Sequence, residues 1–331
     1  MKTATALPAS RPAPAIRSRV RQVADLRYMA VLTVVATYVL IVLGGTVRAT
    51  GSGTACPDWP LCQGQLVPPA ETKVMIEYSH RLLASVVGFL ILGTLFWGWR
   101  TYREHRLFTG GAVAVVLLLA GQVILGGITV KTETAASVVA LHLAIALTLL
   151  TLLIVIALAT FVLESGRTFP AVTGGVGGLA RRFWALPISL LGVTFALIIV
   201  GAFVSQTGAG LVYPDWPLFN GKLVSAGGRL ADLHYAHRML AAIAGVLVIG
   251  FAWQIWDEDR RPLLVVATGL ALLLFIAQAL VGAANIWLEL TTSVRILHLA
   301  LASAVWAVLV FALAYRHLVP PGHLSIPESH A

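Results

Sequence analysis

Charged residues are scarce in this sequence. Only 11% of its 331 residues are Asp, Glu, Lys or Arg, whereas 58% are hydrophobic. Soluble domains carry about 25% charged residues, so a water-soluble fold of this composition would leave too much apolar surface in contact with water. The shortage of charge excludes an ordinary soluble domain and indicates an integral membrane protein.

Cysteine is almost absent as well. The two cysteines, Cys56 and Cys62, are too few for a scaffold held together by disulfides. They allow a single disulfide if they face an oxidising compartment, and two free thiols are the alternative.

Long apolar runs are what the sequence has instead. A helix needs about 20 mostly apolar residues to cross a bilayer. Eight segments meet this condition: 27–47, 78–99, 109–130, 137–161, 183–204, 234–255, 263–284 and 293–315. The sequence therefore predicts an all-α integral membrane protein with eight transmembrane helices.

Basic residues concentrate in alternate connections between these segments. Most of the Lys and Arg residues fall in 1–26, 100–108, 162–182, 256–262 and 316–331. The positive-inside rule places these stretches, and hence both termini, in the cytoplasm. Topology thus accounts for the net charge of +9, and no nucleic-acid partner is expected.

Besides the transmembrane bundles, the sequence predicts three cytoplasmic regions. They are a cytoplasmic N-terminal tail (1–26), a cytoplasmic linker (162–182) and a cytoplasmic C-terminal tail (317–331). Residues 1–26 are rich in Pro and Arg and poor in acid, a composition shared with mitochondrial transit peptides. We favour a disordered tail here, and a transit peptide is the alternative.

The two halves of the chain repeat each other. CPDWPLCQGQLV (56–67) matches YPDWPLFNGKLV (213–224), and SVVALHLA (137–144) matches SVRILHLA (293–300). Each half contains four predicted spans, an even number, so both halves enter the membrane in the same direction. The expected architecture is two four-helix bundles, 27–161 and 183–316, related by a pseudo-twofold axis along the membrane normal.

Four histidines lie at matched depth in these bundles. His80 and His237 are near the outer start of the second and sixth spans, and His142 and His298 are about one turn into the fourth and eighth. Two facing imidazoles in an apolar bundle suit the axial positions of haem iron, whereas zinc needs further ligands. Hydrogen bonding between helices is the alternative, and the duplication favours haem.

Polar neighbours of the histidines fit the same interpretation. Arg81 and Arg238 directly follow two of the histidines, and Arg295 lies one turn before His298, so these arginines are candidates for contacts with haem propionates. Their alternative role is to snorkel to the interface. Gln122 and Gln278 are repeated inside the third and seventh spans, where they face either the ring edge or a neighbouring helix.

The halves also differ in an informative way. Glu77, Cys56 and Cys62 of the first half are His234, Tyr213 and Phe219 in the second. Glu77 lies three residues before His80 and so shares its helical face. We expect the Glu77 carboxylate to point into the cavity beside a bound ring. The alternative is that Glu77 is solvated and is simply favoured by the dipole at the start of the helix.

Taken together, GGTVRATGSG, CPDWPLC, Glu77-x-x-His80, His142 and their C-terminal echoes resemble the haem A synthase family, in its bacterial type with a cysteine pair in the N-terminal half. The similarity covers about 27–316. It implies an enzyme of the bacterial inner membrane that oxidises a ring methyl of haem O to a formyl group. The product, haem A, serves terminal oxidases.

The resemblance also implies roles for individual residues. His80 and His142 would hold the iron of the substrate haem O, Glu77 would be the catalytic carboxylate, His237 and His298 would ligate a haem b cofactor, and Cys56 and Cys62 would form a disulfide. The implied partners are haem O, the haem O synthase (a farnesyltransferase) and an electron acceptor.

If both axial positions are histidine, the iron has no vacant site for O₂, and an oxygen-rebound mechanism needs one ligand to leave. The preferred alternative withdraws electrons from the substrate macrocycle and captures water at the methyl carbon. Glu77 would take the proton or stabilise positive charge. A di-haem b electron-transfer cytochrome is the main rival, but it predicts equivalent halves. A transporter predicts broken spans, whereas only Pro187 lies inside a span.

Overall fold

The computed structural model describes residues 14–164 and 178–319. Within them the chain forms eight α-helices and one 3-10 turn. The helices are α1 (Pro14–Ala49), α2 (Thr72–Tyr102), α3 (Arg106–Lys131), α4 (Ala136–Glu164), α5 (Gly178–Thr207), α6 (Arg229–Glu258), α7 (Pro262–Trp287) and α8 (Thr292–Leu318), with the turn η1 (Ala209–Leu211) between α5 and α6.

All eight helices contain a stretch long and apolar enough to cross a membrane. The prediction of an all-α integral membrane protein with eight spans is confirmed. The helices continue beyond the predicted spans, as α2 does from Thr72 to Tyr102 where 78–99 was expected. Apolar runs mark only the part of a helix that lies in hydrocarbon, and backbone hydrogen bonding carries the helix past it.

The prediction of a disordered tail is wrong for residues 14–26, because α1 begins at Pro14. Proline is tolerated in the first turn of a helix, where its missing N–H has no intrahelical acceptor. The linker is also shorter than predicted, since α4 ends at Glu164 and α5 begins at Gly178. The rest of the predicted tails and linker, 1–13, 165–177 and 320–331, lies outside the described residues.

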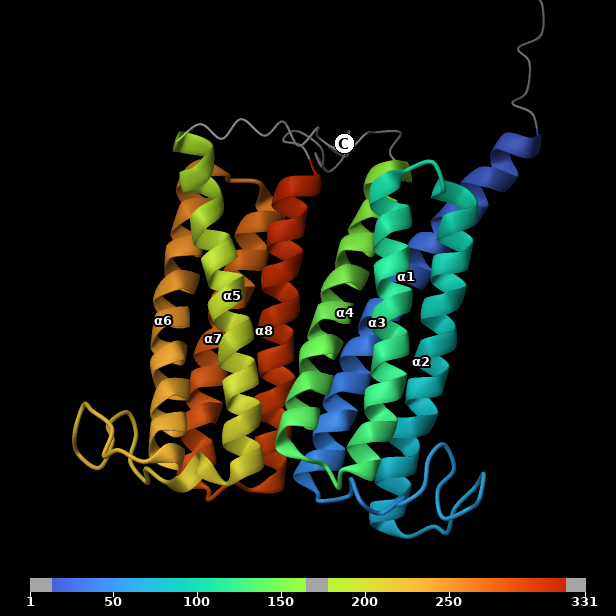
Figure 1. Cartoon of the computed structure of the whole chain (residues 1–331). Coiled ribbons are helices and arrows are strands. Elements are labelled where there is room, and N and C mark those ends of the chain that lie inside the picture. The colour runs from blue at the N-terminus through green and yellow to red at the C-terminus, as the bar shows by residue number, and fades with distance from the viewer. Residues whose placement is uncertain (1–13, 165–177, 320–331) are drawn as a thin grey trace, which may run out of the picture.

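The helices form two four-helix bundles that stand side by side (Figure 1). Helices α1 to α4 build one bundle and α5 to α8 the other, each around its own apolar core. A third cluster joins the bundles, and it draws on helices α1, α4, α5 and α8. In this cluster the indole of Trp306 donates hydrogen bonds to the Leu147 carbonyl at 3.2 Å and to Thr151 Oγ1 at 3.0 Å.

The long α1–α2 and α5–α6 connections lie at the same end of the molecule, with the short α3–α4 and α7–α8 turns beside them (Figure 1). This shared end follows from the parallel repeat, because corresponding helices of the two halves run in the same direction. We call it the loop end. The repeated histidines lie near it, about two turns after the first residues of α2, α4, α6 and α8.

Candidate functional site

The structure brings the histidines of each bundle together. In the C-terminal bundle the ring centroids of His237 on α6 and His298 on α8 are 6.5 Å apart, with an interplanar angle of 67°. In the N-terminal bundle, His80 on α2 and His142 on α4 are close enough for their charges to interact. All four are partly buried within the bundles.

The spacing of the C-terminal pair fits one metal atom held between two imidazoles. Metal–nitrogen bonds of about 2 Å on opposite sides of the metal place the two ring centroids roughly 6 Å apart. The observed 6.5 Å is therefore compatible with axial ligation of haem iron by both residues. A third His, Cys, Asp or Glu in metal-binding range is absent from the described residues, which argues against a structural zinc site.

Each histidine packs against a glycine of a neighbouring helix. A Cβ added to Gly44, Gly126, Gly201 or Gly282 would lie 3.1, 3.8, 2.8 or 3.2 Å from Cε1 of His80, His142, His237 or His298 respectively. The four glycines come from α1, α3, α5 and α7 and occupy corresponding positions in the two halves. A side chain at Gly44, Gly201 or Gly282 would press against the neighbouring imidazole, whereas the contact at Gly126 is an ordinary van der Waals contact.

The imidazole nitrogens themselves have few protein partners. Nδ1 of His80, His142, His237 and His298 is buried without a hydrogen bond in the described residues. The Gln278 amide nitrogen lies 3.3 Å from Nε2 of His298, next to the lone pair that a metal would use. Buried polar groups normally find partners, so these free nitrogens favour an additional bound group.

If His237 and His298 hold a haem, as the sequence predicts, replacing Gly201 by alanine is expected to weaken its binding. The added Cβ would lie 2.8 Å from Cε1 of His237. The imidazole must therefore move, and it would no longer face His298 in the same orientation. Gly192→Ala in the same helix is the matched control, because a Cβ there has no neighbouring atom within 4 Å. The haem-to-protein ratio of the purified variants measures the effect, and equal ratios would show that the glycine does not position the ring.

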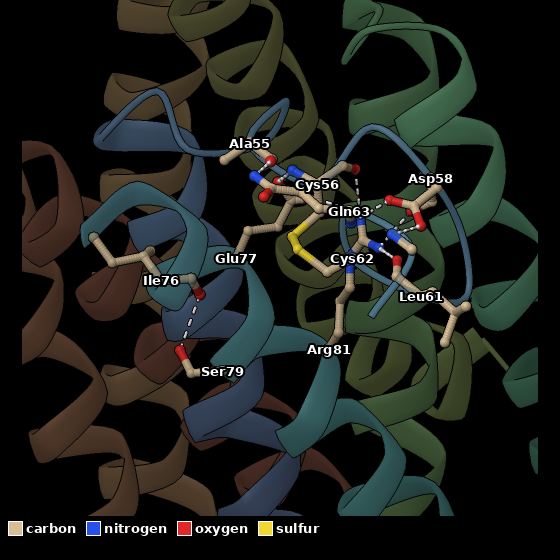
Figure 2. Close-up of a disulfide and its surroundings, with 11 residues drawn as sticks. Ala55, Cys56, Asp58, Leu61, Cys62, Gln63, Ile76, Glu77, Ser79 and Arg81 are labelled. Atoms are coloured by element: carbon tan, nitrogen blue, oxygen red, sulfur yellow. Dashed lines mark hydrogen bonds and ion pairs between the residues drawn. A yellow bond between two sulfur atoms is a disulfide. The ribbon is translucent and has the colours of Figure 1, made fainter. Parts of the chain in front are cut away.

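Cys56 and Cys62 form a disulfide in the α1–α2 connection, with their Cα atoms 4.6 Å apart. Both residues are buried, under the N-terminal end of α2. The backbone N–H of Cys56 donates a hydrogen bond of 2.9 Å to Oε2 of Glu77. Figure 2 shows the Glu77 side chain directed from α2 toward this disulfide loop.

Glu77 and Arg81 fasten this loop to α2. The other oxygen of Glu77, Oε1, accepts a hydrogen bond from Nη2 of Arg81 at 2.5 Å. Arg81 also donates to the carbonyl groups of Cys56, Asp58 and Leu61 at 2.6–2.7 Å. Glu77 is only 3% exposed, so its negative charge is stabilised by one guanidinium and one backbone N–H (Figure 2).

In the second half an arginine also holds the loop against its helix, but a histidine takes the place of the glutamate. We call this arrangement of arginine and loop carbonyl groups the clamp. Arg238 donates to the carbonyl groups of Tyr213, Asp215 and Leu218, as Arg81 does at the corresponding places. Its Nε lies 3.1 Å from Nε2 of His234, which stands where Glu77 stands in the first half. An uncharged imidazole can accept this hydrogen bond, so the acidic group is dispensable for the clamp itself.

Aromatic packing replaces the disulfide in the second half. The rings of Tyr213 and Phe219 contact edge to face with centroids 5.1 Å apart. Arg238 lies over both rings, and the Tyr213 hydroxyl is within hydrogen-bond distance of Ser225 Oγ at 2.9 Å. A covalent link is therefore not required for this loop shape, so the cysteine pair of the first half calls for its own explanation.

Each loop contains the same tight turn after its PDWPL segment. Gln63 and Gly64, like Asn220 and Gly221, have positive φ, as the two central residues of a type I′ turn require. Asp58 and Asp215 accept the N–H groups of these central residues. The hydrogen bond from Gly64 and that from Gln63 hold the pKa of the Asp58 carboxyl below its ordinary value.

Comparison with known proteins identifies the family of this chain. Residues 27–310 match the model of the family described as cytochrome oxidase assembly protein. The chain belongs to this family.

Relatives within the cytochrome oxidase assembly protein family carry a common name. Proteins named "Heme A synthase" from Geobacillus kaustophilus, Listeria welshimeri and Alkalihalophilus pseudofirmus are 30%, 29% and 27% identical to this chain. The alignments cover 87%, 87% and 89% of this chain and 90%, 92% and 97% of the relatives. The resemblance predicted from the motifs is confirmed.

The arginines predicted to contact propionates have other partners in this family member. A guanidinium has five N–H donors. Hydrogen bonds to the loop and to Glu77 occupy four of them in Arg81, and hydrogen bonds to the loop and to His234 occupy four in Arg238. Arg295 donates to the carbonyl of Ala49, at the end of α1. The propionate contacts stay a prediction, and Arg295 keeps the most free donors for them.

Sequence reasoning missed two features of the site. Gly126 and Gly282 were expected to allow close approach of a bulky ligand or a neighbouring helix, but Gly44 and Gly201 were not identified, although they are repeated at the spacing of the two halves. The partners of Glu77 were not predicted either, since one of its oxygens accepts a hydrogen bond from the loop and the other from Arg81, and its orientation toward the cavity beside His80 stays a prediction. Helical spacing gives the face of a helix but not the loop that folds back on it.

Proposed function

We propose that this chain is a haem A synthase, an oxidoreductase that converts haem O to haem A. The observation that carries the proposal is the pair of matched histidine sites, each held by glycines, in a chain whose relatives are named "Heme A synthase". A di-haem b electron-transfer cytochrome would account for the histidines alone. It would not account for the names of the relatives or for the acidic group and disulfide present in only one half.

The two bundles take different porphyrins in this proposal. His80 and His142 bind the iron of haem O in the N-terminal bundle, and His237 and His298 bind a resident haem b in the C-terminal bundle. The asymmetry around Glu77 and the disulfide supports this order, because a reacting substrate and a resident electron carrier need different surroundings.

Haem b, when bound, supplies a carrier of single electrons. Oxidation of a methyl group to a formyl group removes electrons and protons and adds one oxygen atom. The protein contributes orientation through the imidazoles and their glycines, and it contributes a carboxylate, Glu77, at the substrate end of α2. Glu77 forms an ion pair with Arg81, and a carboxylate in this place is suited to stabilise positive charge or to accept a proton.

The topology and partners follow from the same proposal. The protein crosses the membrane several times, and the distribution of basic residues supports a cytoplasmic location for both termini. The disulfide end then faces the oxidising side of a bacterial inner membrane. Haem O arrives from a haem O synthase, and an electron acceptor removes the reducing equivalents.

The test is co-expression of this chain with a haem O synthase in a bacterial host that makes no haem A. We expect haem A in the extracted pigments, separated from haem O and haem B by chromatography, together with a b-type spectrum of the purified protein. A b-type spectrum without any haem A would overturn the synthase assignment in favour of the cytochrome.

A further inference from the structure

Arg48 and Arg295 lie together where the two bundles meet. Gly45 of α1 packs against Leu299 of α8 so closely that a Cβ at Gly45 would collide with the leucine side chain. Because α1 and α8 run in opposite directions (Figure 1), Arg48 and Arg295 both lie about one turn from this contact toward the loop end. Nη1 of Arg295 is 3.3 Å from the carbonyl oxygen of Ala49, the residue next to Arg48.

Neither arginine belongs to the internal repeat. Arg48 corresponds to Ser205 in the match of TVRATGSG with FVSQTGAG, and Arg295 corresponds to Val139 in the match of SVRILHLA with SVVALHLA. Each half thus carries one additional arginine, placed where it meets the other half. A packing role common to both bundles does not account for this arrangement.

The charges of the two guanidinium groups are poorly compensated. They repel each other, and neither forms an ion pair within the described residues. Nε of Arg48 is buried and has no hydrogen-bond partner there. Arg295 also lies in the first turn of α8, where the helix dipole disfavours a positive charge.

Capping of α1 explains only part of this arrangement. The bond from Arg295 to Ala49 satisfies a carbonyl at the end of α1, where a cation is favourable. It uses one donor of Arg295 and leaves Arg48 without an acceptor for its buried Nε. An oxyanion between the two guanidinium groups would satisfy these donors and cancel the repulsion.

We propose that Arg48 and Arg295 form one oxyanion site shared by the two bundles, and that it binds a porphyrin carboxylate. Gly44, one turn before Arg48, contacts His80, and Arg295 lies one turn before His298. The pair therefore lies about one helical turn closer to the loop end than an imidazole of each bundle. The propionates of a ring held by these imidazoles would be within reach of the two arginines. This inference rests on the proposed function, and a lipid phosphate is the competing source of the oxyanion.

The test compares two porphyrins that differ only in their carboxylates. Full-length protein from a haem-deficient host, purified in detergent, is titrated with iron protoporphyrin IX and with its dimethyl ester. We expect the wild type to bind the free acid about tenfold more tightly than the ester, the effect of one charge-assisted contact. Arg48→Gln and Arg295→Gln should each lose this preference, while Arg48→Lys and Arg295→Lys, which keep the charge, should retain part of it.

Arg229→Gln is the matched control, because Arg229 is an exposed arginine at the same end of the molecule. If the glutamine variants still form the bis-imidazole spectrum and still prefer the acid tenfold, the shared site is wrong and the proposed function stands. If phospholipid phosphorus co-purifies with the wild type and is lost from both variants while the acid preference is unchanged, the site binds lipid and the carboxylate assignment is overturned. A wild type without any bis-imidazole spectrum would instead overturn the proposed function.

Discussion

A His298→Ala variant is expected to lose its b-type haem spectrum while its fold persists. His298 and His237 face each other at 6.5 Å between ring centroids, so each would supply one axial nitrogen to the same iron. Removing a residue that is hydrogen-bonded to a metal ligand lowers metal affinity about 10–100-fold. Removing the ligand itself should lower the affinity further. The absorbance of the reduced protein and the haem extracted per mole of protein measure the effect.

The controls separate this effect from general damage. His80→Ala should keep the b-type spectrum and stop haem A formation, because it removes a ligand from the other bundle. His105→Ala should change neither property, since His105 lies between α2 and α3 and contacts Tyr102, at the end of the bundle opposite to the loop end (Figure 1). Full b-type absorbance in His298→Ala would contradict the assignment of haem b to the C-terminal bundle.

Most of the fold could be predicted from the sequence because membranes restrict the choice of structure. Only helices and closed barrels satisfy every backbone hydrogen bond in hydrocarbon, so eight apolar runs predict eight helices. The duplication then predicts two similar bundles. What could not be predicted is where helices end, as α1 shows by starting at Pro14, because helix ends in water depend on local capping and not on apolar length.

The candidate site was predictable in its residue types and less so in its contacts. The histidines were found because an ionisable side chain at matched depth in two halves is costly without a role. The partners of the Glu77 carboxylate were not found, because they depend on a loop whose peptide groups return to α2 at Cys56. The juxtaposition of Arg48 and Arg295 was not predicted for a related reason, since Arg295 comes from the other half and no local spacing connects the two residues.

A Glu77→Ala variant is expected to keep its b-type spectrum and to lose haem A formation by at least about 100-fold, the usual contribution of a general acid or base. The side chains of Glu77 and Arg81 are 4% and 16% exposed, so their ion pair is largely shielded from water. Removing one partner of a buried pair costs about 3–5 kcal/mol. The variant should therefore also be less stable, and thermal unfolding in detergent measures this.

Two further variants distinguish the chemical role of Glu77 from its role in holding the loop. Arg81→Gln removes the donors to the loop but leaves the carboxylate bound to the N–H of Cys56. Glu77→Gln keeps an acceptor for that N–H and removes the charge. If the charge takes part in the oxidation, Glu77→Gln should be as inactive as Glu77→Ala while Arg81→Gln retains measurable haem A formation. An equal loss of haem A formation in Arg81→Gln and Glu77→Gln would mean that Glu77 acts only by holding the loop. Alkylation of Cys56 and Cys62 before and after reduction would show whether the disulfide is still present in each variant.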